Sequence, residues 1–225
     1  MIITIDGPVA SGKSTVARKL AQRLEMYYLG TGLMFRGLAY VLIEHASYDE
    51  YDLHNPKQHD LRRFLNSKIF FYDCDASCSG RILFDGQDVT SRLKNVHIDA
   101  AASILSTNKV VRQALLQVQR LCGQKCDLVA EGRDVGSVVF PNADAKFFLT
   151  ASVLVRAQRW QADQKKKGNS VSLDEAINVI SVRDERDSNR EVAPLIKPHG
   201  AIVVDNSDCD IEKTLEIIEQ NLQKK

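Results

Sequence analysis

Short apolar runs and helix-like repeats alternate along most of the chain. Apolar runs occur at residues 2–5, 27–29, 127–130, 146–149 and 201–204, and each has the length of a buried strand. In most of the segments that follow them, apolar residues recur every three or four positions, as on one face of a helix. Because strands and helices alternate, the pattern predicts an α/β fold with a central parallel sheet and right-handed crossovers.

The alternation is interrupted between residues 46 and 94. Residues 46–60 are polar and predict a loop that leads into a helix at 61–65. Residues 69–72 and 81–84 are apolar and aromatic, which favours strands, and Asp85-Gly86 marks a tight turn after the second of them. These features predict a small antiparallel β unit inserted into the α/β chain.

The composition limits the classes of protein to which the chain can belong. Its formal net charge is +1, so charge gives no indication of nucleic-acid or membrane binding. The chain enters its first strand without a secretion signal, and no apolar stretch is long enough to span a bilayer. We therefore expect a cytoplasmic protein that binds neither nucleic acid nor membrane.

The cysteines are five in number, and an odd count without a secretion signal predicts reduced thiols. Four of them form two C-x₃-C pairs, a spacing that also admits a zinc site, but free thiols are the simpler interpretation. The five residues are Cys74, Cys78, Cys122, Cys126 and Cys209.

Residues 7–15 read GPVASGKST and match the pattern G-x-x-x-x-G-K-[ST] between a predicted strand and a predicted helix, the context of a phosphate-binding loop. The glycines let the backbone curl so that several N–H groups converge on one anion, and the helix start adds its positive dipole end. Lys13 supplies charge to the outer phosphates of ATP, and the Ser14 hydroxyl can ligate Mg²⁺. The residues predicted to bind ATP are Gly7, Pro8, Val9, Ala10, Ser11, Gly12, Lys13, Ser14 and Thr15.

A second group of polar residues comes directly after the predicted strand at 127–130, where residues 131–134 read EGRD. In open α/β sheets, ligands bind at the carboxyl ends of strands. Glu131 could therefore hold a Mg²⁺-bound water, and Arg133 could face a phosphate. A salt-bridged surface loop is the alternative interpretation.

Two further segments carry candidate phosphate-binding arginines. Gly30-Thr31-Gly32 precedes a predicted helix that contains Arg36, although an exposed helical arginine would give the same pattern. Residues 156–190 are rich in both charges and include Arg156, Arg159 and the run 183–190. This density is typical of a solvated helix face with ion pairs, or of a mobile arginine-rich flap that closes over phosphates and excludes water.

Taken together, these motifs resemble the bacterial cytidylate kinases of the nucleoside monophosphate kinase group. Two of these motifs are much more specific to that family than the phosphate loop. They are G-R-D-x-G at 132–136 and R-D-x-R-D-x-x-R-x-x-x-P-L at 183–195. The resemblance covers nearly the whole chain and includes the phosphate loop and residues 28–36, 84–90, 102–103, 111–112, 131–141 and 183–195.

The resemblance implies a three-layer P-loop NTPase fold with a central parallel sheet, an inserted antiparallel β lobe that binds the nucleoside monophosphate, and a short helical lid. The core would span about 1–30, 95–155 and 191–225, the lobe about 31–94, and the lid about 156–190. The implied reaction transfers the γ-phosphate of ATP, with Mg²⁺, to CMP or dCMP. The partners would be these small molecules, and the protein would be a monomer.

The resemblance also implies a role for each candidate residue. Arg36, Arg133 and Arg190 would clamp the acceptor phosphate, and Ser103, Arg112 and Asp134 would read the cytosine edge. Arg183 and Asp187 would contact the sugar, Arg156 and Arg159 would be lid arginines near ATP, and Thr31 would lie near the acceptor. The residues expected to act in catalysis are Lys13, Arg133, Arg190, Arg156 and Arg159.

The chain departs from the family pattern where Gly30 replaces an Asp and Phe35 replaces a Tyr, which puts the fine geometry of the acceptor site in question. Two other functions remain open. A kinase of another small acceptor, such as UMP, AMP or shikimate, shares the phosphate loop. A nucleotide-dependent switch protein would also carry it, but the chain has no Asn-Lys-x-Asp motif for reading a base.

Overall fold

A computed structural model describes residues 1–66, 68–74 and 78–223. The chain forms two compact units. The loop unit consists of Met1–Leu20 with Glu131–Lys225, and the insert unit is Ala21–Ala130. The division into core, lobe and lid that the resemblance implies stays a prediction.

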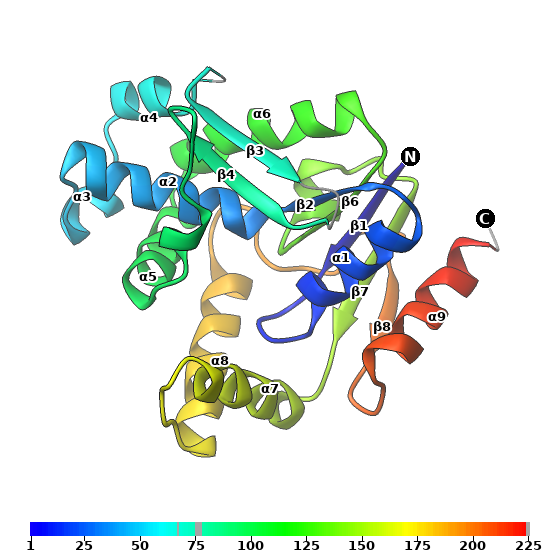
Figure 1. The fold of residues 1–225 in the computed structure, drawn as a ribbon. Coiled ribbons are helices and arrows are strands. Elements are labelled where there is room, and N and C mark those ends of the chain that lie inside the picture. Colours follow the sequence, from blue (N-terminus) through cyan, green and yellow to red (C-terminus); the bar gives the residue numbers. More distant parts are fainter. Residues whose placement is uncertain (67, 75–77, 224–225) are drawn as a thin grey trace. The chain divides into compact units, whose positions relative to one another are not determined.

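The central sheet has five strands in the order β2-β6-β1-β7-β8, which confirms the predicted α/β class (Figure 1). In the loop unit, β1 pairs with β7 and β7 with β8, both in parallel. Ile3, Ile5, Phe147 and Leu149 are fully buried, so these two central strands carry the apolar core that their sequence predicted. The strands are β1 (Ile2–Asp6), β2 (Tyr27–Gly30), β6 (Leu128–Gly132), β7 (Ala145–Thr150) and β8 (Ile202–Asp205).

The helices of the loop unit follow its strands. The last helix buries Leu215 and Ile218 from the predicted apolar face, while Ile211 at its start is exposed. None of the helices in the described part of the chain combines the length and apolarity that crossing a membrane requires. The helices are α1 (Lys13–Arg23), α7 (Val153–Lys166), α8 (Leu173–Asn189) and α9 (Ile211–Leu222).

The charge-rich segment at 156–190 falls on α7 and α8. A capping box in which Ser172 and Glu175 exchange hydrogen bonds starts α8. Ala157 of α7 and Ile180 of α8 share a buried apolar cluster with Val9 of the phosphate loop. The segment therefore packs on the loop unit through an apolar face as well as carrying charges.

The insert unit contains the predicted antiparallel sheet, in the order β3-β4-β5. Gly37 lies under this sheet, because a Cβ there would approach Ile82 to 2.9 Å. The strands are β3 (Phe70–Cys74), β4 (Gly80–Phe84) and β5 (Gln87–Asp88), and the helices are α2 (Thr31–Ala46), α3 (Glu50–His54), α4 (Gln58–Phe64), α5 (Val96–Leu105) and α6 (Lys109–Lys125), with a 3₁₀ turn at Thr90–Leu93.

The predicted loop at 46–60 is wrong, because α3 and the start of α4 occupy much of it. A capping box between Asp49 and Asp52 starts α3, and Leu53 is its buried anchor. Such a short helix offers one apolar contact, so its periodicity does not stand out among polar neighbours.

The strand predicted at 127–130 extends further than expected. Glu131 and Gly132 lie inside β6 rather than beyond its end. A single π-helical turn, Val135–Val139, follows. The buried Asp6 carboxylate accepts hydrogen bonds of 2.7 Å from Val135 N and from Gly136 N and so fixes this turn against β1. Burial raises the pKa of Asp6 to about 6, although both N–H groups favour its charged form.

Candidate active site

The phosphate loop lies between the end of β1 and the start of α1. Ala10 and Gly12 have φ values of 57° and 87°, in the left-handed region that lets the backbone curl. A Cβ at Gly7 would lie 2.1 Å from the Leu149 carbonyl oxygen, so only glycine fits there. The Gly12 carbonyl accepts from Thr15 N and Val16 N, which starts α1 directly at the loop. This curled backbone is the conformation that the motif predicts for an anion cradle, while its binding of phosphate stays a prediction.

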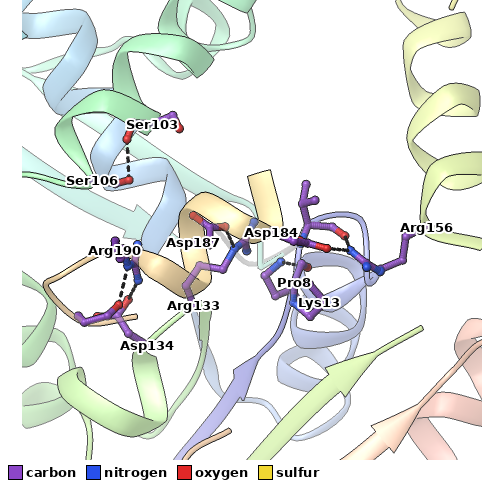
Figure 2. Close-up of polar contacts among 12 residues, drawn as sticks. Pro8, Lys13, Ser103, Ser106, Arg133, Asp134, Arg156, Asp184, Asp187 and Arg190 are labelled. Carbon is purple, nitrogen blue, oxygen red and sulfur yellow. Dashed lines mark hydrogen bonds and ion pairs between the residues drawn. The ribbon is translucent and has the colours of Figure 1, made fainter. Parts of the chain in front are cut away.

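Lys13 lies at the centre of this cradle. Its side chain is buried, and its Nζ donates a 3.0 Å hydrogen bond to the Pro8 carbonyl oxygen (Figure 2). Burial, with a further contribution from Arg133, lowers the pKa of Lys13 to about 7. Glu131 and Asp187 act in the opposite direction. Together with Arg183, which also lowers the pKa of Lys13, the structure thus brings Lys13 within the electrostatic influence of four other predicted site residues.

Ser14 and Glu131 fit the predicted metal site. The Ser14 hydroxyl donates a 3.0 Å hydrogen bond to a Glu131 carboxylate oxygen. Hydroxyl and carboxylate oxygens are the hard ligands that Mg²⁺ prefers, and Mg²⁺ in kinases takes few protein ligands because phosphates and waters supply the rest. Accordingly, the described residues include no group of three or more His, Cys, Asp or Glu side chains that could enclose a metal by themselves.

Two arginines of the loop unit lie in buried or half-buried ion pairs. Arg133 Nε donates to the Asp187 carboxylate at 2.7 Å, and Arg190 Nη2 donates to the Asp134 carboxylate at 3.3 Å (Figure 2). Burial alone would raise the pKa of Asp187, but Arg133 and Arg190 hold it below its usual range. Arg183 also contributes to lowering the pKa values of Lys13 and Asp187, so it lies in the same group.

Arg156 is an interior residue with only 5% of its surface exposed. Its guanidinium donates to the carbonyl oxygens of Ala151 and Val9 at 3.0 and 3.1 Å, and to the Asp184 carboxylate at 2.5 Å. Asp184 in turn accepts from Val9 N at 3.3 Å. Arg156 therefore joins α7, α8 and the phosphate loop, while its contact with ATP stays a prediction.

A cavity of about 730 Å³ opens beside the phosphate loop within the loop unit. Gly12, Lys13 and Ser14 line one side, and Arg159 lies on another. A volume of this size suits a nucleotide-sized ligand. The lining also includes residues that the sequence interpretation did not single out, namely Lys19, Ala162, Asp163, Lys166, Asn206, Cys209, Asp210 and Glu212.

Asn206 could have been found from the sequence, because it comes directly after a predicted strand. The rule that drew attention to residues 131–134 also applies to the end of β8. Asparagine and serine are also common in turns, so residues 205–207 fit a plain connection to the last helix equally well.

The insert unit holds the other predicted acceptor residues. Arg36 Nε donates to the Asp99 carboxylate at 2.6 Å. Arg112 Nη1 donates to the Ser106 carbonyl oxygen at 2.9 Å. The Ser106 hydroxyl donates to the Ser103 carbonyl oxygen at 2.8 Å (Figure 2). Arg112 and Ser103 are therefore linked through Ser106, which joins two of the residues predicted to read the base. Thr31 is the first residue of α2 and is buried.

The two departures from the family pattern have local explanations. A Cβ at Gly30 would lie 2.8 Å from the Tyr28 hydroxyl, so an Asp there requires Tyr28 to move. The ring of Phe35 lies 5.6 Å from the Arg112 guanidinium, so Phe35 still gives that cation an aromatic partner without a hydroxyl.

A cavity of about 870 Å³ in the insert unit lies between β3, α4 and α6. None of the predicted site residues contributes to its described lining, which includes Cys122 and Cys126. All five cysteines are free thiols.

Lys13 lies in a glycine-rich loop between a strand and a helix, and cations and the Ser14–Glu131 pair surround it. This arrangement is that of a phosphate-loop protein of the nucleotide-kinase class. A family model described as cytidylate kinase matches residues 3–224. The chain belongs to the cytidylate kinase family.

Individual relatives agree with this assignment. A cytidylate kinase of Pseudomonas syringae pv. tomato is 42% identical over 217 residues, which cover 96% of this chain and 93% of that protein. A cytidylate kinase of Geobacter sulfurreducens is 38% identical over 226 residues, covering 100% and 94%. Among solved structures, an uncharacterized protein from Eubacterium ventriosum shares the fold, with a TM-score of 0.52, 14% identity, and coverage of 100% and 99%.

Proposed function

We propose that the protein transfers the γ-phosphoryl group of ATP to CMP or dCMP and releases ADP with CDP or dCDP. The observation that carries this proposal is the position of Lys13, which lies in the phosphate loop under the influence of Arg133, Arg183, Glu131 and Asp187. A loose phosphoryl-transfer transition state spreads negative charge over the transferred oxygens, so cations from several directions stabilise it. Family membership supports the choice of acceptor.

The donor side of the reaction uses the loop unit. Backbone N–H groups of residues 7–15 hold the phosphates of ATP, and Lys13 reaches the outer ones. Ser14, and Glu131 through a water, would hold Mg²⁺, which would supply positive charge to neutralise the phosphates of ATP. Arg156 and Arg159 of α7 act on the same nucleotide, the first by holding the loop and the second from the wall of its cavity.

On the acceptor side, each of the three arginines proposed to bind the CMP phosphate forms an ion pair with a carboxylate in the structure. Arg133, Arg190 and Arg36 exchange part of these ion pairs for the dianionic phosphate of CMP, which offers each of them a more strongly charged partner. A phosphate oxygen of CMP is already substantially anionic at neutral pH, so it attacks without a dedicated general base. Catalysis is therefore positioning and charge stabilisation.

The cytosine base gives the acceptor its identity. Its amino group donates to the Asp134 carboxylate, which Arg190 keeps in place, and its ring nitrogen and carbonyl accept from Arg112 and Ser103. Uracil presents a carbonyl where cytosine has the amino group, so Asp134 repels it. Arg183 and Asp187 contact the sugar, and Thr31 lies near the acceptor.

An acceptor panel tests the proposal. ADP release is measured with CMP, dCMP, UMP, AMP and shikimate, and we expect CMP or dCMP to give the highest kcat/KM. The Lys13→Ala variant should lose about 10²–10³-fold in kcat without losing its fold. Asp134→Asn should reduce the preference for CMP over UMP by about tenfold or more. Preference for another acceptor, or nucleotide hydrolysis that no acceptor stimulates, would replace the proposal with one of the two alternatives.

The remaining parts of the proposal concern the whole protein. We propose a cytoplasmic monomer in which residues 31–94 move as the acceptor lobe and 156–190 as the lid. Light scattering coupled to size-exclusion chromatography tests the oligomeric state, and a stable dimer would contradict it.

A further inference from the structure

Asn206 connects two parts of the candidate ATP site through its side chain. It follows β8 directly, and only 4% of its surface is exposed. Its Nδ2 donates a 3.1 Å hydrogen bond to the carbonyl oxygen of Ser11 in the phosphate loop. Its Oδ1 accepts a 3.0 Å hydrogen bond from Arg159 Nη1 of α7. One amide group thus contacts the loop and the arginine at the same time.

The backbone of Asn206 strengthens the same connection. Its carbonyl oxygen accepts a second hydrogen bond from Arg159, from Nη2 at 2.9 Å. Its N–H donates to the carbonyl oxygen of Thr150 at 2.9 Å, which fixes Asn206 to the end of β7. Arg159 therefore presents two nitrogen atoms to one residue, and that residue is tied to the sheet.

The chemistry of the partners allows few side chains at position 206. The Ser11 carbonyl can only accept, so it requires a donor, whereas Arg159 can only donate and requires an acceptor. A primary amide of this length meets both requirements. A carboxylate would place an oxygen against the Ser11 carbonyl oxygen. An apolar side chain would leave the Ser11 carbonyl with the longer, 3.5 Å hydrogen bond from Arg159 Nη1 and would remove the Oδ1 acceptor of that arginine.

The hydrogen bonds of Asn206 lie beside the proposed ATP site. Asn206 and Arg159 line the 730 Å³ cavity together with Gly12 and Lys13. A Cβ at Gly12 would lie 3.6 Å from Asn206 Nδ2, so the amide packs directly against the loop. With alanine at position 206, the long Arg159 side chain would keep the backbone carbonyl as an acceptor but lose the Oδ1 acceptor and gain rotamer freedom, which binding of the nucleotide would have to remove again.

We propose that Asn206 is a positioning residue for the ATP site, which acts by holding the Arg159 guanidinium at a fixed place beside the phosphate loop. This inference rests on the proposed binding of ATP by residues 7–15. Asn206 works through Arg159 and Ser11, so its removal should weaken ATP use more than CMP use.

A double-mutant cycle on Asn206→Ala and Arg159→Ala tests the proposal, with kcat and the KM values for ATP·Mg²⁺ and CMP measured for all four proteins. Asn206→Ala alone should lower kcat/KM for ATP about tenfold, mostly through KM, and change the KM for CMP less than twofold. In the Arg159→Ala background, the same change should cost less than threefold, because the arginine it positions is gone. Equal losses in both backgrounds would overturn the proposal.

Two further variants separate positioning from folding. Asn221→Ala is the matched control, since Asn221 donates a side-chain hydrogen bond to the Ile217 carbonyl within α9, and it should leave both KM values unchanged. Asn206→Asp keeps the acceptor for Arg159 and should retain more ATP efficiency than Asn206→Ala; an equal loss in the two would contradict the arginine-positioning role. The melting temperature of each variant shows that the comparison is made on folded protein. If Asn206→Ala does not fold, the cycle is run with Asn206→Ser and Arg159→Ala, because the shorter serine side chain lacks the amide oxygen that accepts from Arg159.

Failure of this inference differs from failure of the proposed function. If Arg159→Ala and Lys13→Ala both leave the KM for ATP unchanged, the assignment of the ATP site is wrong. If those variants lose ATP affinity but Asn206→Ala does not, only the positioning role is wrong.

Discussion

Lys13 lies in the interior although its side chain ends in a group that is normally charged. Burial lowers its pKa to about 7 from an ordinary value of 10.5. Between these two pH values the unfolded chain binds more protons at this lysine than the folded protein does. The free energy of unfolding of the nucleotide-free protein should therefore rise with pH across this window as far as Lys13 is concerned.

The same shift predicts that ATP binding takes up protons. At pH 8 most of the Lys13 side chains are neutral, and the triphosphate favours the ammonium form, so binding should draw close to one proton from the buffer. Calorimetric titration with ATP·Mg²⁺ at pH 8 in two buffers of different ionisation enthalpy measures this uptake. Lys13→Arg is the control, because a guanidinium stays charged at this pH and should take up none. Equal uptake in both proteins would show that another group supplies the effect.

Sequence reasoning at the residue scale succeeded where the chemistry is local. The phosphate loop needs Gly7, Gly12 and Lys13 in fixed order, so its pattern could be recognised directly. The contacts of Arg156 and Asn206 depend instead on which strand ends and helices come together in the fold. Their spacing in the sequence carries no such information, and the Asn206 amide looks like that of any other turn.

At the scale of elements, strands and long helices were predictable, whereas short helices were not. Strands β1 and β6 bury nearly all of their residues, and each begins as an apolar run in the sequence. The helix α3 spans only Glu50–His54 and depends on a capping box, so its polar residues resembled a loop. The charge pattern of 156–190 suggested either a solvated face or a flap, and α7 and α8 show that charged residues can also lie inside the unit.

Arg156 links α7 to α8 and to the phosphate loop, so its removal should destabilise the fold. Replacing it with Ala leaves the Asp184 carboxylate and the carbonyl oxygens of Ala151 and Val9 without this donor. We expect the free energy of unfolding, measured by urea titration, to fall by about 3 kcal/mol, since breaking a largely buried ion pair leaves its partner uncompensated. Lys165→Ala removes an exposed lysine from α7 and should change stability by less than about 0.5 kcal/mol. Similar stabilities for the two variants would mean that Arg156 is not a structural link.

At the scale of the whole molecule, the alternation of strands and helices was enough to predict the fold class, because a parallel sheet requires a crossover between successive strands. The antiparallel insertion was recognisable for the opposite reason, since its aromatic strands are close together in the sequence. The two compact units were not predicted with their observed bounds. Their division follows from contacts between residues 1–20 and 131–225, which periodicity along the chain does not report.

The assignment of the two nucleotides to different parts of the molecule can be tested with the protein's own thiols. Cys209 lines the cavity beside the phosphate loop, whereas the exposed Cys126 belongs to the insert unit. At about ten times its Kd, ATP·Mg²⁺ should occupy about 90% of the sites and slow alkylation of Cys209 by iodoacetamide up to about tenfold. Peptide mass spectrometry measures both thiols in one sample, so Cys126 is the internal control and should react at an unchanged rate. CMP alone should protect neither thiol, and Lys13→Ala should lose the protection by ATP at the same concentration. Protection of Cys209 by CMP alone, or equal protection of both thiols by ATP, would contradict the placement of ATP in the 730 Å³ cavity.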